Sequence, residues 1–154
     1  MKKAFLATAM VVALTAIAAG CGSDDSDSTS AALSKPEFIK EADAICADGN
    51  AAIEEEAEAF AEENDVDTEK PTKAQQEEVI SDVVAPNVQG QAEEIADLGA
   101  PEGDEETIEA MVEAVEKGAG ELESDPALLL EGENPLGDGS KLARAYGLEE
   151  CGEE

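Results

Sequence analysis

Histidine and tryptophan are absent from this sequence, and other aromatic residues are few, with one tyrosine and three phenylalanines. Without histidine, the chain cannot form Ser-His-Asp or Cys-His nucleophilic sites, histidine zinc sites, or the Glu-x-x-His motif of di-iron bundles. It also contains no Gly-x-Ser-x-Gly, Walker or dinucleotide-binding glycine motif. Ser140 and Lys141 are adjacent, and adjacent side chains on a helix point apart, so no Ser-Lys pair is expected. The sequence therefore predicts a protein with no enzymatic activity and no bound cofactor.

Basic residues are also scarce. Nine lysines and arginines stand against 39 aspartates and glutamates, which gives a formal net charge of −30 at pH 7. Such a surface repels nucleic-acid phosphates and anionic lipid headgroups, so we expect no nucleic-acid partner. Three interpretations of the acidic residues stay open: a solvated surface, a face that binds cations, and a surface that docks a basic protein partner.

The N-terminus has the parts of an export signal. Lys2 and Lys3 precede an apolar run over residues 4–19, which is shorter than the roughly 18 residues of a membrane-spanning helix. The run ends in Ala18-Ala19-Gly20-Cys21, and a Ser/Asp-rich tract follows. This arrangement resembles the lipobox signal of bacterial lipoproteins, except that Ala18 stands where a larger aliphatic residue is usual. Ordinary cleavage after Ala18 and a retained anchor are the two alternatives.

The resemblance to lipoproteins implies a division of the chain into three parts. Residues 1–20 would be the signal peptide, and Cys21 would become a mature N-terminus that carries a diacylglyceryl thioether and palmitate-type acyl chains. Residues 21–33 would then be the lipidated cysteine and a flexible tether, about 20 Å long on average, and residues 34–154 a single helical domain. The implied location is the extracytoplasmic face of the cell membrane, with the membrane as a partner through the lipid anchor.

The domain begins with a predicted long helix. Ser34 and Glu37 have the spacing of a capping box, and Pro36 suits the first helical turn. The apolar or small residues that follow recur every 3.7 positions or so, which is a helical period. We expect the helix to continue through Gly49, because the pattern keeps its phase there, and to end near Glu63-Asn64. The positions of this pattern are Phe38, Ala42, Ile45, Gly49, Ile53, Ala57 and Phe60.

A second helix is predicted from Thr72, which forms another capping box with Gln75. Its apolar pattern runs from Ile80 to Leu98, and Pro86 lies inside it, so we expect a kink at Pro86. Polar side chains cluster beside this kink. They either line a polar pocket or lie on the solvated side of a bent helix; they are Pro86-Asn87, Gln89 and Gln91.

Two further helices complete the predicted fold. Asp104 is a candidate N-cap for a third helix that ends at residues 124–126, with or without an extra turn through Leu128 to Leu130. An irregular link over residues 133–139 precedes a short helix from Ser140 to Tyr146, with Gly147 as its C-terminal glycine. No segment alternates with a period of two. The sequence thus predicts an all-α fold: a small bundle of three main helices plus a short C-terminal helix.

The domain also resembles small uncharacterised exported helical proteins of high-GC Gram-positive bacteria. The resemblance rests on SKPEFI (34–39), ADAIC (42–46), LGAPEGDE (98–105) and AYGLEECG (145–152). None of these segments is a catalytic signature, so the resemblance implies a fold and no activity.

Two cysteines remain after lipidation, Cys46 in the first helix and Cys151 just past the last. Exported proteins usually pair such cysteines, so we predict a disulfide that ties the C-terminus to the first helix. A buried thiol together with an exposed one is the alternative.

Two functions are consistent with these features. The first is a membrane-anchored lipoprotein that acts as a non-enzymatic binding or structural module. The second is an extracytoplasmic protein that binds calcium or a small solute. The weak candidates for a metal site are Asp65, Asp67 and Glu69, which alternate in a loop but lack the glycine and final glutamate of an EF-hand.

Overall fold

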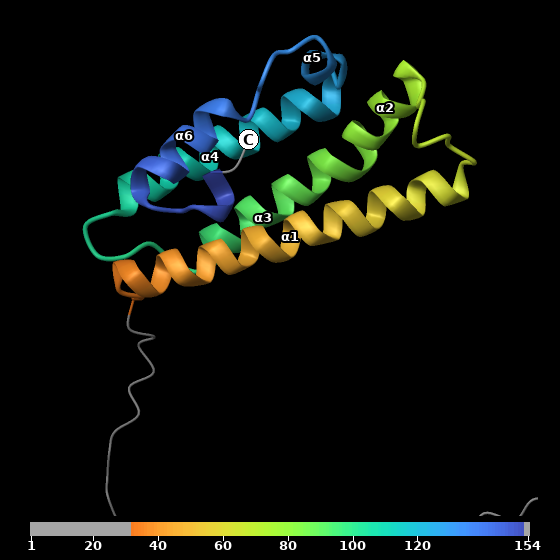
Figure 1. Ribbon diagram of the computed structural model, residues 1–154. Helices are drawn as coiled ribbons and strands as arrows, with labels where there is room; N and C mark the ends of the chain where they lie inside the picture. The colour runs from red at the N-terminus through yellow and green to blue at the C-terminus, as the bar shows by residue number, and fades with distance from the viewer. Residues whose placement is uncertain (1–31, 153–154) are drawn as a thin grey trace, which may run out of the picture. The chain divides into compact units, whose positions relative to one another are not determined.

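The computed structural model describes residues 32–152 (Figure 1). The predicted signal peptide, Cys21 and the tether up to residue 31 lie outside this range. None of residues 32–152 is in a β-strand, and none of the helices in this range is long and apolar enough to cross a membrane. The described range belongs to one compact unit, Ala31–Glu154.

Helix α1 spans Lys35–Glu63, as predicted. Its capping box is present, since the backbone N–H of Ser34 donates to Glu37 Oε2 at 3.1 Å. Hydrogen bonds from the Ser34 hydroxyl and from its backbone N–H hold the pKa of the Glu37 carboxyl below its ordinary value. The helix passes through Gly49 without a break, as predicted. A β-carbon at Gly49 would overlap the Gln91 side chain where it now lies, so the glycine leaves room for this side chain.

The second predicted helix is present but divided into α2 (Lys73–Val79), a π-helical turn η1 (Ile80–Val84) and α3 (Ala85–Asp97). The Thr72–Gln75 capping box is confirmed, with Gln75 N–H donating to Thr72 Oγ1 at 3.3 Å. The predicted distortion lies in the turn before Pro86, where Ala85 N–H donates to Ile80 O. Proline has no N–H to donate to the backbone carbonyl one turn before it. The widened π-helical turn accommodates this missing hydrogen bond.

The C-terminal half contains α4 (Glu105–Ser124), the single turn α5 (Ala127–Leu130), α6 (Gly137–Tyr146) and the 3₁₀ turn η2 (Glu150–Gly152). The expectation of an irregular link up to residue 139 is wrong, because Gly137 and Gly139 are helical and buried. A β-carbon at Gly139 would overlap Val115, so the glycine lets α6 lie directly against α4. Gly147 ends α6 in the left-handed conformation, with φ at 113°, as predicted.

The long segments form a bundle in which successive segments run in alternating directions (Figure 1). Helix α3 packs between α1 and α4, and α6 packs on α4. The all-α prediction is confirmed, and so is the disulfide: Cys46 in α1 bonds Cys151 in η2, with Cα atoms 5.2 Å apart. Buried residues from α1, α3, α4, α6 and the C-terminal segment form the main core, and they are Phe38, Ala42, Cys46, Ile95, Ile108, Met111, Ala143, Tyr146 and Leu148.

The start of the domain differs slightly from the prediction. The sequence assigns Leu33 to the tether, but its side chain is half-buried and packs against the main core. The folded part therefore begins before the Ser34 capping box, because an apolar residue preceding the cap gains free energy by burial.

Candidate functional site

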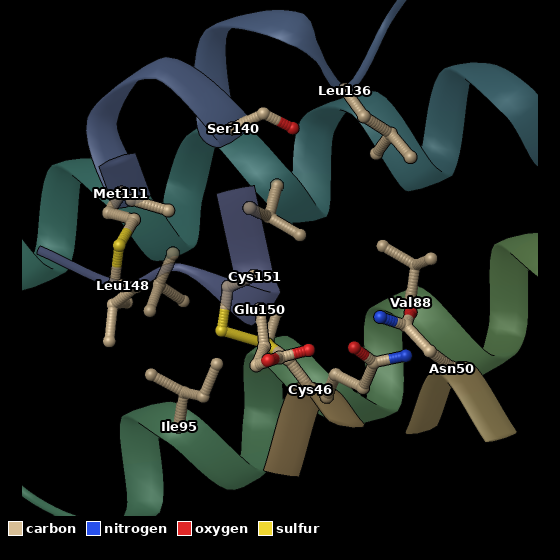
Figure 2. Close-up of a pocket in the computed structure, with 15 residues that line it drawn as sticks. Cys46, Asn50, Val88, Ile95, Met111, Leu136, Ser140, Leu148, Glu150 and Cys151 are labelled. Atoms are coloured by element: carbon tan, nitrogen blue, oxygen red, sulfur yellow. A yellow bond between two sulfur atoms is a disulfide. The ribbon is translucent and has the colours of Figure 1, made fainter. Parts of the chain in front are cut away.

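A cavity of about 130 Å³ lies between α1, α3, α4, α6 and η2 (Figure 2). Helical spacing explains how its walls form, since residues three, four and seven positions apart share one face of a helix. Most wall residues are apolar: Val88, Ala92, Ile95, Met111, Val112, Val115, Leu136, Ala143 and Leu148. A cavity of about 150 Å³ with similar walls is large enough to bind benzene. This cavity therefore has room for a molecule about the size of one aromatic ring.

Two polar side chains on the cavity walls are largely buried, and one of them lacks a partner among the described residues. Ser140 is only 9 % exposed. The Gln91 Nε2 atom is buried and has no hydrogen-bond partner within residues 32–152. An unsatisfied buried polar group costs about 1–3 kcal/mol. The cavity thus combines mostly apolar walls with the Ser140 hydroxyl and with one unpaired amide group, Gln91 Nε2, that a bound molecule would satisfy.

Both polar groups are held in place by the bundle. Ser140 follows Leu136 by one helical turn in α6 and donates its backbone N–H to the Leu136 carbonyl at 3.0 Å. Gln91 lies against the backbone of α1, where Gly49 leaves room for it. Their positions therefore follow from the packing of α6 and α3, and mobile loops do not supply either group.

We assign the opening of the cavity to α1 and η2, because these elements carry the exposed residues among those described residues that line it. Asn50 and Glu150 line it and are exposed, and Figure 2 shows both near the disulfide, across the cavity from Ser140. The Glu150 backbone N–H donates to Asp43 Oδ1 at 3.0 Å, and Cys151 is bonded to Cys46. These two links fix η2 on α1. Glu150 carries the only charge among the described residues that line the cavity.

An outer groove of about 560 Å³ lies on the other side of the α1–α3 contact. Pro86, Asn87 and Gln91 line it, as expected for a polar pocket at the kink, whereas Gln89 does not. The Asn87 amide is already engaged, donating to Glu56 Oε2 at 2.8 Å and to Val83 O at 2.9 Å. Among the described residues, Gln91 alone lines both the groove and the cavity.

The candidate metal residues lie in the exposed loop between α1 and α2. Asp67 Oδ1 accepts a hydrogen bond from the Glu69 N–H at 3.1 Å, within the loop itself, and Asp65 has a φ of 51°. Within residues 32–152, no three acidic or cysteine side chains converge in a way that could hold a metal ion. The structure therefore does not bring Asp65, Asp67 and Glu69 together as ligands.

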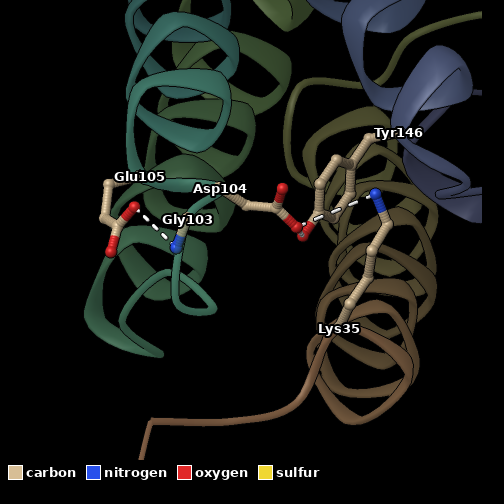
Figure 3. A network of polar contacts seen from close by, with 5 residues as sticks. All are labelled: Lys35, Gly103, Asp104, Glu105 and Tyr146. Carbon is tan, nitrogen blue, oxygen red and sulfur yellow. Dashed lines mark hydrogen bonds and ion pairs between the residues drawn. The ribbon is translucent and has the colours of Figure 1, made fainter.

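A polar network joins the start of α1 to α4 and α6 (Figure 3). The Tyr146 hydroxyl donates to Asp104 Oδ2 at 2.7 Å, and Lys35 Nζ lies 3.7 Å from the centre of the tyrosine ring. Burial, and then the Asp104 carboxylate, raise the pKa of Tyr146. Asp104 is the N-cap residue of α4, as predicted, but its carboxylate makes this tertiary contact and no capping hydrogen bond. Beside it, Glu105 accepts a hydrogen bond from Gly103 N–H at 2.9 Å.

Sequence reasoning misses Ser140 and Glu150 as site residues. It considers Ser140 only with Lys141, which is exposed and pairs with Asp138 at 3.1 Å. One signal is present: a serine one turn from Leu136 and near Ala143 shares their apolar face. Glu150 has no comparable signal, because it is one of 39 acidic residues.

Comparison with known proteins gave no match: no protein-family model fits this chain, and no curated protein or solved structure is significantly similar to it.

Proposed function

We propose that this protein is a non-enzymatic binding module, exported and anchored by a lipid on Cys21, whose helical domain takes a small solute into the cavity. One observation supports the binding role above the others: the buried Gln91 Nε2 lacks a hydrogen-bond partner among the described residues and lines a mostly apolar cavity. Pockets that bind small molecules combine apolar walls with a few such groups. The same observation favours a small solute over calcium, which requires six to eight oxygen ligands.

The anchor is proposed from the sequence around Cys21. A signal ending in Ala19-Gly20-Cys21, followed by a Ser/Asp-rich tether, would hold the domain outside the membrane. The acidic surface is consistent with this arrangement, because anionic headgroups would repel it and leave the cavity exposed to solutes.

Replacing Cys21 with serine should release the protein from the membrane, because a serine cannot form the diacylglyceryl thioether. Mass spectrometry of membrane-extracted wild-type protein should show the lipid mass on Cys21. Equal membrane fractions for wild type and Cys21→Ser, or an unmodified N-terminus at Ala19, would contradict the proposed anchor.

Binding to the cavity can be tested with benzyl alcohol, which has a ring of suitable size and one polar group. A ligand of this size should bind with a dissociation constant of about 1 mM, or about −4 kcal/mol. At ten times that concentration, the free energy of unfolding should rise by about 1.4 kcal/mol. Calorimetric titration and thermal unfolding should both detect saturable binding.

Val88→Phe is the informative variant, because Val88 is half-buried, lines the cavity and would fill it with a ring. This variant should lose the binding of benzyl alcohol. Val79→Phe is the matched control, since Val79 is also half-buried but lies outside the cavity. The proposed function fails if benzyl alcohol does not saturate the wild type, or if both variants bind it equally.

A further inference from the structure

Building on the proposed function, we propose that the cavity selects small organic cations, with Glu150 as the residue that recognises the positive group. The ligand would place its apolar body between α3, α4 and α6 and its ammonium group at the opening. This assigns a ligand class to the cavity and a specificity-determining role to a single carboxylate.

The first argument concerns charge. Glu150 is the only charged residue among those described residues that line the cavity, and it lies at the opening. Its carboxylate forms no ion pair with any of residues 32–152. The whole chain carries a net charge of −30, so cations are attracted and anions repelled before they reach the opening.

The second argument concerns position. The Glu150 backbone is fixed on one side by the hydrogen bond to Asp43 and on the other by the disulfide at Cys151. A carboxylate on a fixed backbone loses less conformational entropy when it pairs with a ligand than one on a mobile loop. Asn50 lies at the same opening and offers an amide oxygen to a second ammonium hydrogen.

The third argument concerns the depth of the cavity. Ser140 lies across from Glu150, so the two ends of the cavity differ in chemistry: a carboxylate at the opening and a neutral hydroxyl at the opposite wall (Figure 2). The walls between them are apolar. A molecule with one charged end and a ring-sized apolar body matches this order, whereas a doubly charged or fully polar molecule would bury polar groups against apolar walls.

Three probes of nearly equal size separate charge from shape: benzylamine, benzyl alcohol and benzoate. Titration calorimetry on the full chain in detergent micelles, at 150 mM salt, gives the three affinities. Titration into micelles without protein is the blank. Benzylamine should bind up to about fivefold more tightly than benzyl alcohol, as expected for one exposed ion pair. Benzoate should show no measurable binding.

Glu150→Gln should abolish the preference for benzylamine and leave the affinity for benzyl alcohol unchanged. Glu149→Gln is the matched control, because it removes the same charge from an exposed neighbour that does not line the cavity. This control variant should keep the preference.

The outcomes separate the two proposals. Saturable binding with equal affinities for benzylamine and benzyl alcohol would refute the selection of cations and leave the binding function in place. The selection of cations is also refuted if Glu150→Gln and Glu149→Gln reduce the preference equally, because the net charge would then account for it. If none of the probes binds saturably, the binding function and the cation inference fail together.

Discussion

Replacing Cys46 and Cys151 together with alanine should lower the free energy of unfolding by up to about 4–5 kcal/mol. The disulfide closes a loop with a sequence separation of 105 residues. On the chain-entropy account, a loop of about 100 residues is worth about 4.7 kcal/mol, although measured values often fall below it. For a domain of this size, the melting temperature should fall by about 10–20 °C. Thermal and urea unfolding of the two proteins measure this difference directly.

Reduction provides the internal control. A reductant should lower the melting temperature of the wild type toward that of the double alanine variant and leave the variant unchanged. Native protein that titrates two free thiols, or a wild type whose stability does not respond to reductant, would contradict the prediction. The variant should also bind benzyl alcohol more weakly, because η2 would be attached to α1 mainly through the Asp43 hydrogen bond.

The long helices could be predicted because local signals and packing agree in them. The Ser34 and Thr72 capping boxes mark two helix starts, and the apolar pattern of α1 keeps its phase through Gly49. The pattern does not show why a glycine stands there. That reason is the Gln91 side chain, which is 42 residues away in sequence and comes close only when α3 packs on α1.

The start of α6 was predicted incorrectly, and tertiary packing is the cause. Local sequence patterns treat glycine and proline as breaks, although tertiary packing decides what they do. Gly139 lies in a helix where α6 packs directly against Val115 of α4, and Pro86 is accommodated by a π-helical turn before it. Asp104 has the residue type and position of a cap, but Tyr146 and Lys35 compete for its carboxylate.

The candidate site could be predicted only in part, because a cavity is a property of several helices together. Gln91 stands out in the sequence as a polar residue at the kink, and it does line the groove and the cavity. The loop acids Asp65 and Asp67 are the more obvious candidates by composition. They do not converge, because the loop uses one of them for its own hydrogen bond.

Phe38→Ala is the single substitution in the core from which we expect the largest loss of stability. The Phe38 side chain is 0 % exposed and lies edge-on to the Tyr146 ring, with ring centroids 5.9 Å apart. It therefore joins the start of α1 to α6. Removing a fully buried phenylalanine leaves a cavity and typically costs about 3–5 kcal/mol.

Phe60→Ala is the matched control, because it makes the same change in the same helix at a half-buried position. Its cost should be less than half that of Phe38→Ala, since less apolar area returns to water and no closed cavity forms. Urea unfolding should show the difference as a shift of the midpoint at nearly constant slope. Equal losses for the two variants would mean that the core does not centre on the contact between Phe38 and Tyr146. A large change in slope would instead show that α6 detaches from α1 before the rest of the bundle unfolds. The aromatic pair is the contact through which α6 packs on the first turns of α1.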